Sequence, residues 1–332
     1  MKLVILQSYA LREGDIDWSA VRAQADECLL WPRTPAAETA ARIGGAELAI
    51  VNKSWIDEAV LDACPNLRWV GLMATGTDSL DLAACRRRGV PVANVPGYST
   101  PAVAQHVFSL LLTLCQCPDR YNAAVRAGCW QTDIGPQFAV TPQRELAGRV
   151  LGIVGYGAIG QAVARIALAF GMRVLVFTRT VRPQYAADGV RFVPFDELLA
   201  ASDIVTLHVP ATDATRGLIG EAALAKMKPG AILVNTARGA LVDDAAAARA
   251  LHSGRLAYFA ADVVGAEPIR ADNPLLGCAN ALLTPHIAWA TAESLSRLAG
   301  IVAGNLRSYL AGRPENIVNG PFDGPFTAAL RR

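Results

Sequence analysis

Short, continuously apolar runs alternate with stretches of helical periodicity along most of the chain. A run that is apolar at every position is typical of a strand buried on both faces of a sheet. Strands that alternate with helices favour a parallel sheet with helices on both faces. The expected strands form two series, at 3–6, 48–51, 69–73 and 90–95, and at 150–154, 173–177, 190–193, 204–207, 231–234, 258–263 and 281–283; helices are expected at 56–64, 80–88, 161–170, 221–226 and 243–251. The pattern predicts two α/β lobes.

Two longer helices are expected outside this alternation, at 101–117 and 291–311. Thr100 is a suitable N-cap for the first, and Pro101 suits the first helical position. This helix is apolar on more than one face, so it must be buried. We expect the second helix to pack back on the first lobe. The tail after residue 314 is rich in Gly and Pro and is expected to be coil.

The composition excludes several classes of function. The chain has 332 residues, which allows about two domains. Its 31 basic and 29 acidic residues give a net charge of +2, whereas a nucleic-acid-binding protein usually carries a strongly basic face. No apolar stretch approaches the ~18 residues of a membrane span, and the first residues do not resemble a signal peptide. The seven scattered cysteines lack metal-ligand spacing. We therefore expect a cytoplasmic protein with free thiols and with no metal, nucleic-acid or membrane partner.

A glycine motif follows the strand expected at 150–154. Residues 155–160 read Gly-Tyr-Gly-Ala-Ile-Gly, which is G-x-G-x-x-G, and a helical run and a further strand come next. This is the context in which the motif binds a dinucleotide, because the backbone approaches the pyrophosphate at the amino end of a helix. The alternative is a glycine-rich turn in an ordinary α/β protein.

The end of the next strand bears on the choice of cofactor. An Asp or Glu about 20 residues after the motif would bind the adenosine ribose of NAD. Here Thr178, Arg179, Thr180 and Arg182 occur, without a carboxylate. Guanidinium groups bind phosphate oxygens in pairs of hydrogen bonds, so these residues favour the 2′-phosphate of NADP(H). The alternative is that they are solvated loop residues and that NAD(H) binds without the acid.

Three polar segments follow apolar strands of the second series, where ligands bind in open α/β sheets. They contain Arg238, then Asp262 and Glu267, and then His286. Each residue alone has a structural explanation, such as capping carbonyls or forming a surface turn. Together, beside a dinucleotide loop, they match a carbonyl reduction, which needs a proton donor and a cation that binds a carboxylate.

Long motifs give the chain a resemblance to the D-isomer-specific 2-hydroxyacid dehydrogenase family. They occupy residues 152–160, 202–210, 227–239 and 284–286. Segments 94–100, 103–106 and 286–291 resemble the glycerate dehydrogenase/hydroxypyruvate reductase branch in particular. The resemblance implies a Rossmann dinucleotide-binding domain, 100–287, inserted into a flavodoxin-like substrate-binding domain, 1–99 and 288–332. The chain departs from the commonest family pattern at residues 178–180, where an Asp is usual.

The resemblance also implies catalytic roles. Arg238 would bind the substrate carboxylate and keto oxygen, His286 would be the acid in reduction and the base in oxidation, and Glu267 would hydrogen-bond His286 and stabilise its protonated form. Substrate contacts are implied for Ala74, Thr75, Gly76, Lys53 and Trp289.

Cofactor contacts are implied at several strand ends. Asp262 would face the nicotinamide carboxamide, and Thr236 and Ala237 would line the nicotinamide. The other implied contacts are Gly155, Tyr156, Gly157, Ala158, Ile159, Gly160, Thr178, Arg179, Thr180, His208, Val209, Pro210 and Thr215.

The expected reaction is NAD(P)H-dependent reduction of a small 2-keto acid, with hydroxypyruvate and glyoxylate as the leading substrates, to the D-2-hydroxy acid. One alternative is a related oxidoreductase of the phosphoglycerate, formate or phosphite dehydrogenase type. Another is a dinucleotide-sensing protein similar to corepressors of the same fold. The resemblance further implies a homodimer that packs around the 101–117 helix.

Overall fold

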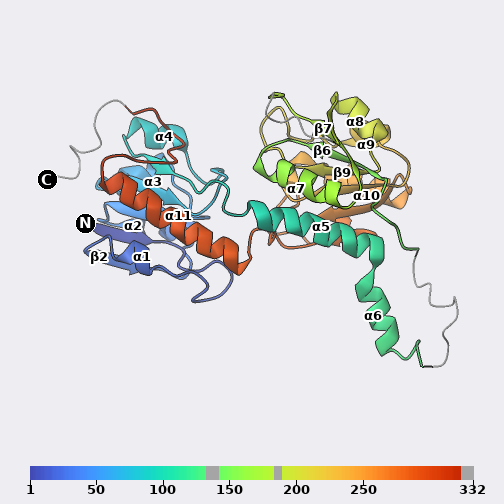
Figure 1. Cartoon of the computed structure of the whole chain (residues 1–332). Coiled ribbons are helices and arrows are strands. Elements are labelled where there is room, and N and C mark those ends of the chain that lie inside the picture. Colours follow the sequence, from blue (N-terminus) through green and yellow to red (C-terminus); the bar gives the residue numbers. More distant parts are fainter. Residues whose placement is uncertain (132–141, 183–188, 323–332) are drawn as a thin grey trace. The chain divides into compact units, whose positions relative to one another are not determined.

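The computed structural model describes residues 1–131, 142–182 and 189–322. The chain divides into two compact units. The N-terminal unit comprises Met1–Ser99 and Ala290–Arg332, and the central unit comprises Thr100–Trp289. Both are parallel α/β structures, as predicted (Figure 1).

The N-terminal unit has a five-stranded parallel sheet with the order β2-β1-β3-β4-β5, which is the flavodoxin-like order. Helices α3 and α4 contact each other. Helix α11 belongs to this unit although it follows the central unit in the sequence. The strands are β1 (Lys2–Ile5), β2 (Glu27–Leu30), β3 (Leu48–Val51), β4 (Trp69–Leu72) and β5 (Val92–Ala93); the helices are α1 (Ser19–Arg22), α2 (Thr39–Ile43), α3 (Glu58–Ala63), α4 (Leu82–Arg87) and α11 (Ala292–Leu310).

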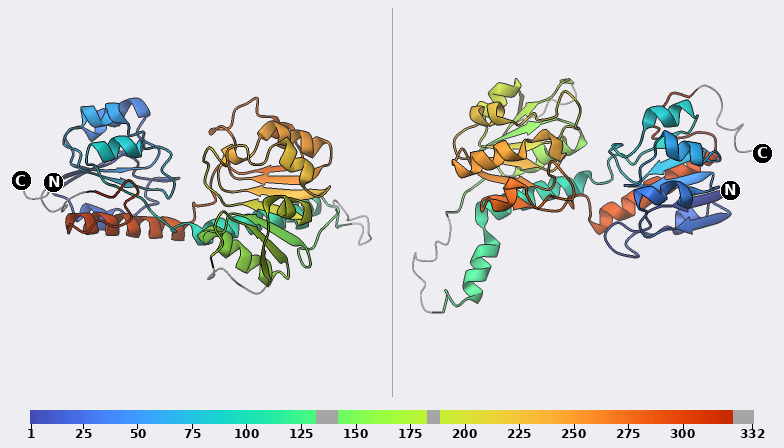
Figure 2. Two further views of the ribbon diagram at one scale, coloured as in Figure 1. Left: turned by 90° about the horizontal axis from the view of Figure 1, so that it is seen from above. Right: turned by 180° about the vertical axis from the view of Figure 1, so that it is seen from behind.

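Helices cover both faces of this sheet (Figure 2). One face carries a buried apolar cluster that includes residues of α2, α3 and α4. On the other face α11 packs against β4, and Tyr309 stacks on Trp69 with a ring-centroid distance of 5.8 Å. Because both faces are covered, β3 and β4 are apolar throughout, and β1 is apolar after Lys2.

Some of the expected elements differ from those observed in this unit. The expected strand 90–95 is reduced to two residues. Pro91 lacks an N–H to donate before it, and after it Asn94 N donates to Asn316 O, outside the sheet. The edge strand β2 was not expected, because Glu27 and Leu29 are exposed and its other two residues are only half-buried. The segment after residue 314 is not wholly coil, since Ile317 forms an antiparallel bridge to Ala93; residues 323–332 lie outside the described part of the chain.

The central unit has a seven-stranded parallel sheet with the order β12-β11-β10-β9-β6-β7-β8. Numbered from β6, this is the Rossmann order 3-2-1-4-5-6 with one further strand. The strands are β6 (Val150–Val154), β7 (Arg173–Phe177), β8 (Val190–Phe192), β9 (Ile204–Leu207), β10 (Ala231–Asn235), β11 (Leu256–Ala261) and β12 (Ala281–Leu283). The helices are α5 (Thr100–Gln116), α6 (Pro118–Arg126), α7 (Ala158–Ala169), α8 (Phe195–Ala201), α9 (Glu221–Lys226) and α10 (Asp244–His252).

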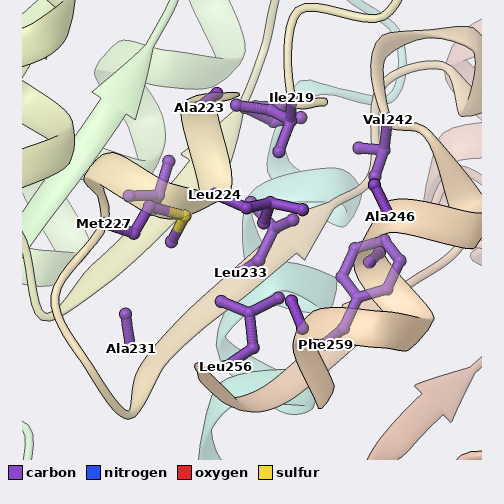
Figure 3. Close-up of a cluster of buried hydrophobic side chains, with 14 of the residues drawn as sticks. Ile219, Ala223, Leu224, Met227, Ala231, Leu233, Val242, Ala246, Leu256 and Phe259 are labelled. Atoms are coloured by element: carbon purple, nitrogen blue, oxygen red, sulfur yellow. The ribbon is translucent and has the colours of Figure 1, made fainter. Parts of the chain in front are cut away.

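Two apolar clusters enclose this sheet. Figure 3 shows the one beneath α9 and α10, where Leu224, Leu233 and Phe259 meet. The other lies beneath α5 and α7, which pack against each other. The apolar residues of α5 are thus largely covered within the unit. Thr100 is already the first residue of α5 and not the N-cap that was expected.

Within the described residues, no helix combines the length and the apolarity that crossing a membrane requires.

Candidate active site

The glycine motif forms the turn between β6 and α7. Gly155 has a φ of +97°, and a Cβ there would lie 2.5 Å from the carbonyl oxygen of His208, so only glycine fits. A Cβ on Gly157, by contrast, would have no atom of the described residues within 4 Å. Gly157 is also the N-cap of α7 and supplies no side-chain hydrogen bond. The helix therefore begins with amides that a phosphate can satisfy, next to open space.

The ends of the two neighbouring strands flank this turn. On one side Gly155 N donates to Phe177 O (2.8 Å), directly before Thr178. Thr178 is half-buried, and Arg179 and Thr180 are exposed. On the other side β9 ends at Leu207, and His208 N donates to Val154 O (2.7 Å). The turn therefore lies where the strand order reverses, which is the usual ligand-binding position in such sheets.

The segment after β9 is held by its own hydrogen bonds. Thr206 Oγ1 lies 3.0 Å from His208 Nε2, and Thr215 Oγ1 donates to Pro210 O at 2.7 Å. Desolvation by burial lowers the pKa of His208 to about 3, so its ring is neutral near physiological pH. Val209 stands beside Gly155, where its side chain would meet an added Cβ. These contacts bring His208–Pro210 next to the glycine turn.

Arg238 follows β10 in a turn that Asn235 organises. The Asn235 side chain donates to Arg238 O (2.8 Å) and accepts from Ala237 N (3.1 Å). Arg238 is half-buried, and its Nη1 donates to Ala237 O at 2.8 Å. Sequence reasoning did not single out Asn235, although a polar residue at the end of an apolar strand could have indicated it. Thr236 Oγ1 is buried and has no hydrogen-bond partner among the described residues, so it has capacity for a bound group.

His286 and Glu267 are in contact. His286 Nδ1 lies 2.6 Å from Glu267 Oε2, and each side chain is about one-third exposed (33% and 34%). Because the carboxylate occupies Nδ1, Nε2 is the ring nitrogen that can reach a substrate. The contact with the carboxylate also fixes the orientation of the ring.

The backbone around His286 is unusual. His286 has a φ of +56°, and its N–H donates to Asp262 O (2.8 Å). The carboxylate of Asp262 accepts from Ile287 N (2.9 Å) and Ala288 N (2.8 Å). Trp289 Nε1 donates to His286 O at 2.9 Å. Asp262 and Trp289 therefore contact the loop that carries His286.

The residues expected to contact the substrate in the N-terminal unit follow two adjacent strands. Lys53 comes after β3 and is exposed, and Ala74, Thr75 and Gly76 come after β4. Thr75 Oγ1 donates to Val95 O (2.7 Å), and Asn94 Nδ2 donates to Thr75 O (2.9 Å). Both segments thus lie at the carboxyl edge of this sheet.

Comparison with known proteins identifies the family. The family model described as "D-isomer specific 2-hydroxyacid dehydrogenase, NAD binding domain" matches residues 108–288. The chain belongs to the D-isomer-specific 2-hydroxyacid dehydrogenase family. Relatives named hydroxypyruvate reductase and glycerate dehydrogenase support the glycerate dehydrogenase/hydroxypyruvate reductase branch of the family. As a member of this family, the chain is an NAD(P)-dependent oxidoreductase.

Individual relatives match over nearly the whole chain. The hydroxypyruvate reductase of Blautia hydrogenotrophica is 41% identical over 96% of this chain and 100% of its own length. The structure of an acyclic imino acid reductase in complex with NADPH and D-Arg matches with a TM-score of 0.84 and 29% identity, over 96% of this chain and 100% of that one. The structure of D-lactate dehydrogenase from Aquifex aeolicus, complexed with NAD and lactic acid, matches with a TM-score of 0.82 and 30% identity. The match covers 97% of this chain and 100% of that one. These matches indicate a nicotinamide dinucleotide as cofactor, and the hydroxypyruvate reductase supports reduction of a 2-keto acid.

Proposed function

We propose that this chain reduces a small 2-keto acid, with hydroxypyruvate and glyoxylate as the leading substrates, to the D-2-hydroxy acid. The contact of 2.6 Å between His286 Nδ1 and Glu267 Oε2 carries the proposal, because it orients the imidazole and leaves Nε2 available to a substrate at the edge of the sheet that carries the glycine turn. The central unit is the dinucleotide-binding domain and the N-terminal unit is the substrate-binding domain.

The dinucleotide, when bound, supplies the hydride that reduces the keto carbon. The open turn at Gly157 and the hydroxyl of Thr236, which has no partner in the described part of the chain, fit such a group. His286 holds a proton at Nε2 and delivers it to the keto oxygen, while Glu267 stabilises the charge on the ring. Arg238 binds the substrate carboxylate and offsets the negative charge that develops on the oxygen.

Further contacts orient the substrate and the cofactor. The amides of Thr75 and Gly76, next to Ala74, bind the substrate carboxylate, and Lys53 and Trp289 are further proposed substrate contacts. Asp262 faces the carboxamide of the nicotinamide in this proposal. The remaining proposed cofactor contacts are the rest of the glycine turn, Tyr156, Ala158, Ile159 and Gly160, together with Ala237, His208, Val209, Pro210 and Thr215.

The variant His286→Ala tests the proton donor. We expect kcat to fall by roughly 10²–10⁴-fold, the range for a positioned acid, with an unchanged Kd for the cofactor. The matched control is His252→Ala on the exposed side of α10, which should leave kcat unchanged. Near-wild-type turnover of His286→Ala would refute the role.

A substrate panel separates the alternative functions. Purified protein is offered hydroxypyruvate, glyoxylate, 3-phosphoglycerate, formate and phosphite with each cofactor, and the nicotinamide absorbance is followed. We expect the highest kcat/KM for the first two. Turnover only with formate, phosphite or phosphoglycerate would assign a different dehydrogenase, and cofactor binding without turnover would favour a corepressor-like protein.

We propose a preference for NADP(H) over NAD(H). Thr178, Arg179, Thr180 and Arg182 support it, because they follow the strand next to the glycine turn and include no carboxylate. Loss of a charged hydrogen bond costs about 1.5–3 kcal/mol, so Arg179→Ala should lower kcat/KM for NADPH roughly ten- to a hundredfold and leave NADH unaffected. The control Arg191→Ala removes an exposed arginine that pairs with Glu197. A higher kcat/KM for NADH than for NADPH in the wild type would contradict the preference.

We also propose a homodimer through the region of the 101–117 helix. Helix α6, which follows α5 directly, buries none of its residues and extends away from the sheet of the central unit (Figure 1). Val125 on this helix and Trp130 beyond it are exposed apolar side chains. A monomer mass in light scattering would contradict this assembly. A cytoplasmic location is proposed as well, because all seven cysteines are free.

A further inference from the structure

The buried carboxylate of Asp262 accepts hydrogen bonds from the loop that carries His286. Its side chain is 1% exposed. Besides the amides of Ile287 and Ala288, it accepts the hydroxyl of Thr284, with 2.5 Å between Oγ1 and Oδ1. A buried carboxylate is stable only where donors replace its water. Asp262 and the loop on either side of His286 therefore stabilise each other.

The hydrogen bonds of this network run in one direction, from His106 through Thr284 to Asp262. An ionised carboxylate only accepts hydrogen bonds, so the single hydroxyl proton of Thr284 points to Asp262. His106 Nε2, on α5, lies 3.1 Å from the same hydroxyl oxygen. Since Thr284 has no second proton to donate, it accepts here and His106 donates. His106 must therefore carry a proton on Nε2.

We propose that His106 is a positioning residue for His286. It acts through Thr284 and Asp262, which hold the loop in which His286 adopts its positive φ. His106 Nε2 also lies 3.6 Å from Asp262 Oδ1, so the ring contributes positive potential to the buried carboxylate. Its place is fixed because α5 packs on α7, β10 and β11. The inference rests on the proposed role of His286 as proton donor.

Paired variants test by kinetics the hydrogen-bond relay that runs from His106 through Thr284 to Asp262. Thr284→Val keeps the shape of the side chain and removes the hydroxyl, and Thr284→Ser keeps the hydroxyl. His106→Leu removes the donor, and His106→Gln offers an amide NH₂ at a similar reach. We expect kcat to fall roughly ten- to a hundredfold in Thr284→Val and His106→Leu, because a shift of about 1 Å in a catalytic group has this effect. The conservative variants should recover to within about threefold of wild type.

A purely structural role would move other readouts. In that case Tm and the cofactor Kd would change along with kcat, and the conservative variants would not rescue turnover selectively. We expect an unchanged cofactor Kd in all four variants, and the control His252→Gln should match wild type throughout. Wild-type kcat in Thr284→Val would overturn the proposal.

The tautomer of His106 gives a test that does not depend on turnover. The chain has four histidines, so nitrogen NMR of protein labelled with ¹⁵N-histidine can be assigned with His106→Leu. We expect His106 to be protonated at Nε2 in the wild type and to lose this preference in Thr284→Val. A neutral ring protonated only at Nδ1 would overturn the relay. If His286→Ala retained full turnover, the proposed proton donor would fail while the NMR result would still report on the relay.

Discussion

Gly239 offers a sharp test of how the catalytic segments are held together. It directly follows Arg238, and a Cβ at this position would lie 1.8 Å from the carbonyl oxygen and 2.0 Å from the carbonyl carbon of Val264. These are backbone atoms, so no side chain can rotate away. The segment that begins at Val264 leads to Glu267. Gly239 is therefore the point where the Arg238 turn touches the segment that leads to the carboxylate partner of His286.

The size of the effect of Gly239→Ala follows from this contact. A carbon normally approaches a carbonyl oxygen no closer than about 3.3–3.6 Å, so the two segments must separate by roughly 1.5 Å. Overpacking of this kind usually costs about 1–3 kcal/mol of the free energy of unfolding. A displacement of about 1 Å at a catalytic group can lower the rate by about 10²-fold. We expect kcat to fall by at least about 10²-fold, with a lower Tm.

The assay compares kcat, KM and Tm with those of Gly277→Ala. A Cβ on Gly277 would meet nothing within 4 Å, and the residue has no positive φ, so this control should behave as wild type. Gly239→Ala with a kcat within about threefold of wild type would show that the contact with Val264 is unimportant for catalysis.

Three further predictions follow from the same structure. Glu267→Gln removes the carboxylate that lies 2.6 Å from His286 Nδ1 and orients the ring. We expect kcat to fall by about 10²-fold, the effect of a misplaced catalytic group, with an unchanged Kd for the cofactor, and a wild-type kcat would argue against the pair. Gly300→Ala and Gly304→Ala place a Cβ in open space on α11, so each should stabilise the protein by about 0.5–1 kcal/mol in urea unfolding, whereas destabilisation would show that the helix surface is covered. The pKa of His208 is about 3 in the folded chain against 6.5 as the ordinary value. The unfolded chain therefore binds the proton first, and the free energy of unfolding should fall by up to about 1.4 kcal/mol for each pH unit from about 6.5 down towards 3. Urea titrations of His208→Gln should show a weaker decrease, and equal slopes would contradict a neutral ring at His208.

Local patterns in the sequence were sufficient for the strands, the glycine turn and the family. The two parallel sheets could be predicted because strands buried on both faces are apolar at every position, as in β3 and β6. Elements that depend on pairing were missed. Strand β2 exists because it pairs with β1 in register, Lys2 opposite Glu27, and its own residues show no strand periodicity. Helix α6 was missed as well, because it buries no apolar face.

The sequence by itself determined which residue types stand at the strand ends, including Arg238, Glu267 and His286. Only the tertiary structure decided which of them meet, since the contact between Glu267 and His286 and the network from His106 to Asp262 join segments that are distant along the chain. Apolar periodicity records whether a residue is buried and not which donor faces which acceptor. That pairing depends on the register of neighbouring strands and on the helix packed across them.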